Sequence, residues 1–244
     1  MRKLPKITIF FWIIKVCCTT LGETAGDALS MSLDLGYLVS TAIFAAIVIA
    51  AVGLQIRAKQ FHPFLYWFTI IATTTVGTTL ADFATRSLGI GYTGGSAILL
   101  ALVIASLLIW RWVMGSVSVD HIETAKGELF YWITIIFSQT LGTALGDWFA
   151  DTADFGYLGA AAVFGGILLI IVALYYFTNI SRVILFWIAF ILTRPLGAVV
   201  GDFLDKPIED GGLNLSRFVA SAVLIAVIVA CILIFPQKAS EKPH

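Results

Sequence analysis

Charged residues are scarce in this sequence. Of its 244 residues, 12% are Asp, Glu, Lys or Arg, whereas soluble globular domains carry about 25%. Apolar residues make up 59% of the chain, and the mean hydropathy is +0.97. So few charges cannot cover a water-facing surface, and the apolar residues gather in long runs, so the composition indicates a membrane protein. It excludes a cytosolic enzyme, a nucleic-acid binder and a disordered chain.

Motifs of common catalytic sites are also missing. The three cysteines lie in apolar runs without a metal-ligand pattern, so we expect them to be small buried hydrophobic residues. The chain has no Gly-x-Ser-x-Gly and no His-Glu-x-x-His motif, and its three histidines fall outside the predicted helices. We therefore expect no enzymatic activity, no bound cofactor and no nucleic-acid partner.

What the sequence does contain is one pattern repeated four times. Four segments align on an aspartate, with Trp fifteen residues before it, Gly five residues before it and Gly nine residues after it. Chance does not reproduce these columns at four sites, so the pattern predicts a two-helix unit that was doubled twice. The aspartates are Asp27, Asp82, Asp147 and Asp202, and the tryptophans are Trp12, Trp67, Trp132 and Trp187.

Each repeat has two apolar stretches, most of them long enough to cross about 30 Å of hydrocarbon. Backbone groups in lipid must be paired within their own segment, so these stretches are predicted to be helices. The predicted fold is an all-α integral membrane protein with eight transmembrane helices. The helices are predicted at 7–30, 38–56, 63–85, 95–114, 128–150, 157–178, 181–204 and 216–235.

An even number of helices in each repeat makes the four repeats parallel to one another. The first half (1–122, repeats one and two) is therefore predicted to be related to the second half (123–244, repeats three and four) by a pseudo-twofold axis along the membrane normal. Both halves form a single membrane domain. We expect the motif helices to form an inner ring with the plainer helices outside, and the tryptophans to anchor the ring at the membrane interface.

The four tandem two-helix repeats, each with a Trp, resemble an uncharacterised family of bacterial membrane proteins that is defined by this repeat. The resemblance covers nearly the whole chain and rests on the Trp, Gly and Asp columns. It implies a membrane fold and a bacterial inner membrane, but it implies no activity.

Lysine and arginine are concentrated on one side of the predicted membrane domain, and the positive-inside rule therefore places both termini in the cytoplasm. The opposite side has only Arg86, Lys206 and Arg217. The basic residues of the first side are Arg2, Lys3, Lys6, Arg57, Lys59, Arg111, Lys126, Arg182, Lys238 and Lys242.

A polar stripe runs along each motif helix and ends at the aspartate. Steps of four residues place Lys15, Thr19 and Glu23 in line with Asp27. Charged side chains in spanning segments are costly and are candidates for function, so converging stripes predict a polar path that ends in carboxylates. The predicted cation ligands are Asp27, Asp82, Asp147, Asp202 and Glu23, and the predicted path residues are Lys15, Thr20, Thr75, Thr78, Gln139, Thr140, Thr143 and Arg194.

The charges predicted to lie within the membrane favour a cation or a proton over an anion. The five carboxylates oppose only Lys15 and Arg194, which leaves −3 if all are ionised. Carboxylate oxygens are the ligands that magnesium, calcium and manganese ions prefer. Because Arg194 occurs only in the fourth repeat, we expect it to pair with an acidic residue of another repeat, such as Glu23 or Asp147, within one asymmetric site.

Three functions are compatible with these features. The leading prediction is a transporter of a small cation, a divalent metal of the manganese, magnesium or calcium type, with possible coupling to protons. One alternative is a proton-coupled transporter of a small organic solute, and another is a non-transporting membrane protein that serves in assembly or sensing. A purely structural role for the aspartates, as caps of helix ends, also stays open.

Overall fold

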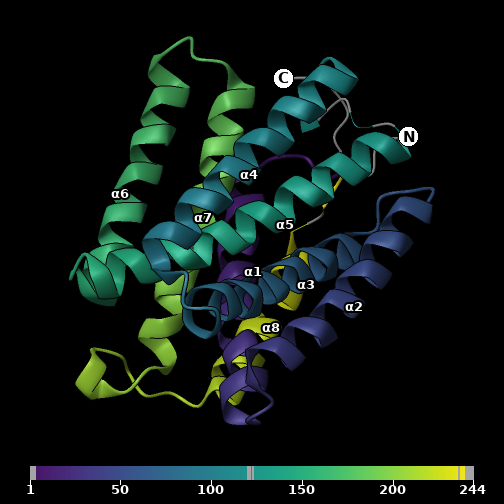
Figure 1. Ribbon diagram of the computed structural model, residues 1–244. Coiled ribbons are helices and arrows are strands. Elements are labelled where there is room, and N and C mark those ends of the chain that lie inside the picture. Colours follow the sequence, from purple (N-terminus) through teal and green to yellow (C-terminus); the bar gives the residue numbers. More distant parts are fainter. Residues whose placement is uncertain (1–3, 120–121, 123, 236, 240–244) are drawn as a thin grey trace.

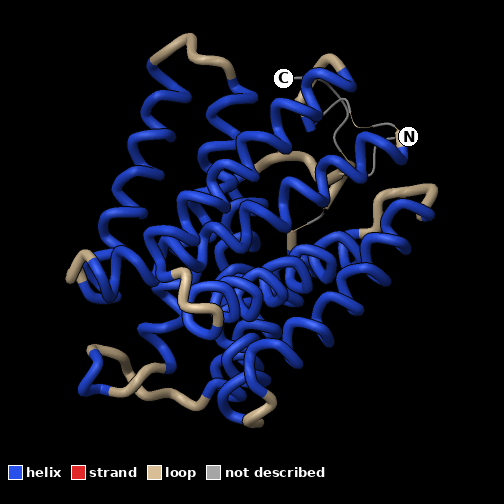
Figure 2. Tube along the Cα trace, viewed as in Figure 1, coloured by secondary structure: helices blue, strands red, loops and turns tan. Residues whose placement is uncertain are grey.

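The computed structural model describes residues 4–119, 122, 124–235 and 237–239. Arg2, Lys3 and Lys242, which belong to the predicted basic side, lie outside these residues. The described chain forms eight long helices, and each is long and apolar enough to cross a membrane (Figures 1 and 2). The motif helices are α1 (Ile9–Asp27), α3 (Pro63–Asp82), α5 (Ala125–Asp147) and α7 (Arg182–Asp205). The second helices of the repeats are α2 (Gly36–Arg57), α4 (Gly91–Met114), α6 (Gly156–Phe177) and α8 (Arg217–Ile234).

The glycine column after each aspartate marks the turn between the two helices of a repeat. In the first three repeats a short π-helical turn follows the aspartate, and the second helix then begins at a glycine. These turns are η1 (Ala28–Ser32), η2 (Phe83–Ser87) and η4 (Trp148–Thr152). The glycines at this column have φ between 63° and 86°, a conformation that favours glycine over other residues. They are Gly36, Gly91, Gly156 and Gly211.

The motif helices form a closed inner ring, as the sequence predicts. Helix α1 packs on α3 and α7, and α5 packs on the same two helices. Over the most apolar 18-residue stretch of each motif helix, 56% to 72% is buried inside the protein, compared with 17% in each outer helix. Each outer helix packs on the motif helix of the next repeat, and α8 packs on α1 to complete the circle. Every repeat therefore depends on its neighbour, and the four repeats interlock in one domain.

The glycine column before each aspartate allows neighbouring motif helices to touch. A Cβ atom added at Gly197 would lie only 2.1 Å from Oγ1 of Thr19 on α1. The neighbour is always the residue eight positions before the aspartate of the adjoining repeat, so four equivalent contacts close the ring. The other three contacts join Gly22 to Thr74, Gly77 to Gln139 and Gly142 to Arg194.

Three members of the tryptophan column are buried between the helices, so for these the prediction of interfacial anchors is wrong, whereas Trp12 is half-buried. Trp67 is 0% exposed and Trp132 is 1% exposed. Each Trp packs on the aromatic ring that precedes the Trp of the adjoining repeat, because the closed ring brings these two columns together. The ring centroids are 5.3 Å apart for Phe11 and Trp67, 5.9 Å for Tyr66 and Trp132, 6.2 Å for Tyr131 and Trp187, and 5.8 Å for Phe186 and Trp12. Eight aromatic residues thus close one end of the inner ring.

We expect Gly197→Ala to destabilise the protein by about 1–3 kcal/mol, because the added methyl group overlaps Thr19 and its backbone. Gly165→Ala on α6 is the control, since a Cβ there meets nothing within 4 Å. Thermal unfolding in detergent measures both variants. Equal stability of the two would contradict the close packing of α7 on α1.

Candidate functional site

One guanidinium group joins all four motif helices at the centre of the ring. Arg194 on α7 is 0% exposed. Its Nη2 donates to Glu23 Oε2 on α1 at 2.8 Å, to Thr78 Oγ1 on α3 at 2.7 Å and to Thr143 Oγ1 on α5. The prediction that Arg194 pairs with an acidic residue of another repeat is therefore confirmed, and of the two candidates the partner is Glu23. The three partners occupy the same column, four residues before each aspartate, so the stripes of these repeats converge here.

The four aspartates lie one helical turn beyond the column that contacts Arg194. They are nearly inaccessible to solvent, with exposed fractions between 1% and 3%. Two basic residues bridge them in pairs. Nε of Arg86 lies 3.1 Å from Asp82 and its Nη2 lies 3.3 Å from Asp147. Nζ of Lys206 lies 3.1 Å from Asp202 and also contacts Asp27. Each basic residue thus bridges the aspartate of its own repeat to that of the next repeat, in agreement with the pseudo-twofold relation of the halves.

These bridges correct the predicted intramembrane charge. Arg86 and Lys206 were assigned to the outer loops, yet both contact the aspartates. With Lys15 and Arg194 they provide four cations against five carboxylates, which leaves −1 instead of −3 if all are ionised. A signal for them was present in the sequence, because each lies four residues after an aspartate and so continues the polar stripe by one more turn.

A further ion pair, which sequence reasoning missed, ties α8 to the site. Nε of Arg217, the first residue of α8, lies 2.7 Å from Asp205 at the end of α7, and its Nη2 lies 3.8 Å from Asp27.

Burial disfavours the charged form of Lys206, but the charges of Asp202, Asp27 and Asp205 outweigh this effect and raise its pKa above the usual value. The neighbouring carboxylates therefore favour the charged form of Lys206.

Three of the predicted cation ligands come together at the junction of the first and fourth repeats. Glu23, Asp27 and Asp202 each offer one oxygen atom, and these atoms lie within 4.8 Å of one another. All three residues are buried, and Asp27 Oδ1 has no hydrogen-bond partner among the described residues. The other two predicted ligands, Asp82 and Asp147, lie on the opposite side of the pseudo-twofold axis and are bridged by Arg86.

Toward the aromatic end, the inner ring contains polar atoms with few partners. Nζ of Lys15 donates to Thr193 Oγ1 at 3.4 Å and lies 4.1 Å from the centroid of the Phe190 ring. The side-chain amide of Gln139 and the Nε and Nη1 atoms of Arg194 have no hydrogen-bond partner among the residues that the structure describes. Lys15 and Gln139 are both 0% exposed.

The threonines predicted beside the stripe use their hydroxyl groups locally. Thr75 donates to the carbonyl of Ile71 at 2.8 Å, and Thr140 donates to that of Ile136 at 2.9 Å. Thr20 is buried at the corresponding position. These two hydroxyls thus bond within their own helices, whereas those of Thr78 and Thr143 reach another repeat.

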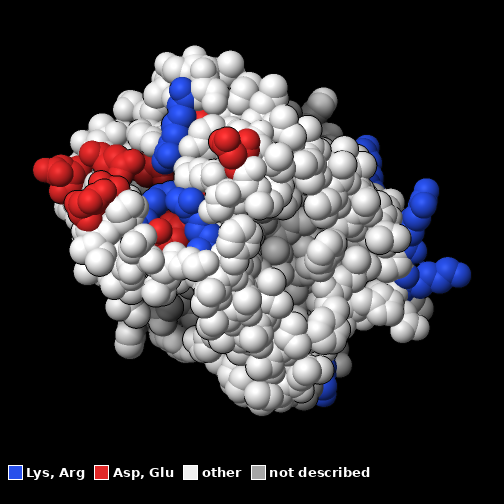
Figure 3. Space-filling view, turned by 90° about the horizontal axis from the view of Figure 1, so that it is seen from below, with Lys and Arg blue, Asp and Glu red and all other residues white. Residues whose placement is uncertain are grey.

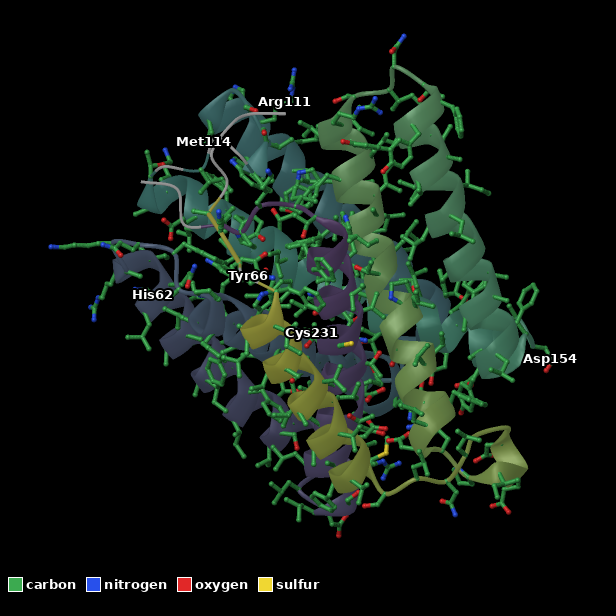
Figure 4. The ribbon with its side chains drawn as sticks, turned by 180° about the vertical axis from the view of Figure 1, so that it is seen from behind. His62, Tyr66, Arg111, Met114, Asp154 and Cys231 are labelled. Atoms are coloured by element: carbon green, nitrogen blue, oxygen red, sulfur yellow. The ribbon has the colours of Figure 1, made fainter. Side chains whose placement is uncertain are left out.

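The site lies toward one end of the molecule. Viewed from below, this end shows acidic and basic side chains close together, whereas only basic side chains appear along the opposite edge of the view (Figure 3). In the view from behind, Asp154, in the turn after α5, lies far from Arg111 and Met114 at the end of α4 (Figure 4). Tyr66 contributes to the aromatic closure, where its hydroxyl bonds with that of Tyr131 at 2.7 Å. The aspartates and the aromatic rings thus occupy opposite ends of the motif helices.

Eight apolar helices in four interlocked repeats define a multi-pass α-helical membrane protein with a buried ion-pair cluster. The chain belongs to the family described as Repeat of Unknown Function (DUF347), whose model matches residues 10–61, 65–116, 130–181 and 185–236. Each match covers one two-helix repeat, which confirms the resemblance seen in the sequence. No curated protein and no solved structure matches the chain.

We expect Arg194→Gln to lower the free energy of unfolding by about 3–5 kcal/mol, because it leaves Glu23 as a buried carboxylate without its cation. The double variant Arg194→Gln with Glu23→Gln removes both charges and should recover part of this loss. Denaturant unfolding in detergent measures the cycle, and Arg111→Gln at an exposed position is the control. Parent-like stability of the single variant would show that Arg194 does not hold the ring together.

Proposed function

We propose that this protein transports a small cation across the membrane, a divalent metal of the manganese, magnesium or calcium type. Glu23, Asp27 and Asp202 would bind the ion. The observation that carries the proposal is the convergence of three buried carboxylate oxygens, from two repeats, within 4.8 Å of one another. Hard divalent cations take carboxylate ligands, and intramembrane ionisable residues mark ion pathways in many transporters.

Lys206 supplies a mechanism for binding and release at this site. Its ammonium group contacts Asp27 and Asp202, which are two of the three ligands. Lys206 directly follows Asp205, the last residue of α7. A divalent ion bound by the carboxylates would displace its ammonium group. The carboxylates then keep a positive partner whether the ion is bound or absent, which limits the cost of unpaired charge in the membrane.

The blocked axis of the ring favours a transporter over an open channel. Arg194 fills the centre of the ring, and the aromatic rings close the end that contains Tyr66 and Tyr131. In transporters built from repeats, one half rocks against the other to expose the site to each side of the membrane in turn, and the two pseudo-twofold halves of this protein would move in the same way. The excess of lysine and arginine at the end that carries the termini supports a cytoplasmic position for that end, in a bacterial inner membrane.

A second candidate, proton-coupled transport of a small organic solute, is favoured by a different observation. Arg194 and Gln139 present polar atoms without hydrogen-bond partners in the described part of the chain. Such atoms would bind a carboxylate or an amide of a solute, and the acidic residues would carry the protons. Flux measured with cations alone distinguishes this function from cation transport.

We expect purified protein in liposomes to carry out flux of at least one ion among manganese, magnesium and calcium. Asp27→Asn, Asp202→Asn and Glu23→Gln should each lower this flux at least tenfold, because each removes one charged ligand. Asp154→Asn, in the exposed turn after α5, is the matched control and should behave as the parent. Cation-independent proton flux, or flux unaffected by the three ligand variants, would refute the proposed site.

Lys206→Gln should lower the half-saturating concentration of the transported cation by about tenfold. The variant removes the ammonium group that competes with the cation for the carboxylates. Two unit charges 4 Å apart interact by roughly 4 kcal/mol at an effective dielectric constant of about 20, and a tenfold change corresponds to only part of this energy. Arg86→Gln removes the pseudo-twofold counterpart and should leave this concentration within about twofold of the parent. The same change in both variants would show that the cation does not bind at the junction of the first and fourth repeats.

A further inference from the structure

An apolar groove opens on the side of the bundle between α1, α6 and α7. Its volume is about 480 Å³. The aromatic side chains of Trp12 and Phe186 line its wall, together with aliphatic residues of α6 such as Ile171. Lys6, just before α1, and Arg182, the first residue of α7, also line the groove, so its basic residues lie at the end of the helices that also carries the termini.

The groove is a departure from the repeat pattern. The tryptophans of the other three repeats are enclosed, and Nε1 of Trp187 donates to the carbonyl of Val117 at 2.9 Å. Trp12 is the half-buried member of the column and lines the groove. Both α2 and its pseudo-twofold counterpart α6 stand at the edge of the bundle (Figure 1), but α2 packs on α5 as well as on α3, whereas the main helix partner of α6 is α7. The repeat alone therefore does not account for an opening at this junction.

We propose that this groove binds one anionic phospholipid from the surrounding bilayer. The phosphate would bind Lys6 and Arg182, and an acyl chain would lie along Trp12 and Phe186. The guanidinium of Arg182 lies over the Tyr175 ring, 4.3 Å from its centroid, and its Nη1 has no hydrogen-bond partner among the described residues. A stacked guanidinium with an unpaired donor suits a phosphate group, and two basic residues that line one groove near the helix ends favour a lipid with net negative charge.

The groove also connects the lipid to the polar interior of the ring. Thr193 lines its wall, and Oγ1 of this residue accepts the hydrogen bond from Nζ of Lys15. Thr193 directly precedes Arg194 on α7. A bound acyl chain would therefore pack against the segment of α7 that positions the central guanidinium. The inference does not depend on the identity of any transported solute.

The test titrates detergent-purified protein with phosphatidylglycerol and, separately, with phosphatidylcholine of the same acyl chains, and follows bound lipid by native mass spectrometry. Phosphatidylglycerol should bind more tightly. Lys6→Gln and Arg182→Gln should each weaken its binding about fivefold, the contribution expected of one basic residue near an anionic lipid. Lys126→Gln, at the pseudo-twofold counterpart of Lys6, and Arg111→Gln are matched controls and should bind as the parent does.

A third variant tests the apolar wall independently of charge. Val172 on α6 lines the groove and is 51% exposed, so Val172→Trp should fold and occupy the space of the acyl chain. It should reduce binding of phosphatidylglycerol at least fivefold. The proposal is overturned by equal binding of the two lipids, by equal losses in the matched controls, or by parent-like binding of Val172→Trp. Thermal unfolding of each variant confirms that it retains the fold.

Discussion

The buried guanidinium of Arg194 constrains the arrangement of the four motif helices. A charge in the interior of a membrane protein is tolerated only when it is paired and hydrogen-bonded. Glu23 supplies the opposite charge, and Nη2 of Arg194 shares its two hydrogens among one residue from each of the other three repeats, Glu23, Thr78 and Thr143. These partners can surround one atom only if the helices form a closed ring at short distance. The glycine column provides that short distance, because a side chain at Gly197 would overlap the adjoining helix.

The common repeat plan places equivalent positions around an axis, and the charged residues then make those positions differ. Arg86 and Lys206 occupy the same column in the second and fourth repeats, and each bridges two aspartates. Arginine is a planar donor that holds its charge under all ordinary conditions, whereas lysine is a compact charge on a flexible stem. Glu23 adds a third carboxylate only on the lysine side. The two pairs of aspartates are therefore equivalent in position but not in chemistry.

The columns of the sequence were sufficient to predict the eight helices, the inner ring and the pairing of Arg194 with an acidic residue of another repeat, because each follows from periodicity and from the cost of unpaired charge. They did not distinguish Glu23 from Asp147 as that residue. Two features did not follow. Trp67 and the other tryptophans were expected at the interface, since sequence spacing does not show which side of a helix meets its neighbour. Lys206 was assigned to the outer side because it follows the predicted helix 181–204, but its side chain returns to the carboxylates of Asp27 and Asp202.

A nearly balanced cluster of charges has a physical consequence for exchange across a membrane. Removing Arg86, Arg194 or Lys206 leaves at least one carboxylate without its ion-pair partner, so a site of this kind favours replacement of one cation by another over simple departure. Lys15 and Arg194 are 0% exposed and lie within long helices, and Arg86 is held between two aspartates of different repeats. Lys206 follows the end of α7 and carries its charge on a flexible four-carbon stem, whereas the planar guanidinium of Arg86 contacts its two aspartates through two different nitrogens. In the proposed function Lys206 is therefore the cation that a transported ion would displace, while the helices that carry Asp27 and Asp202 keep their places.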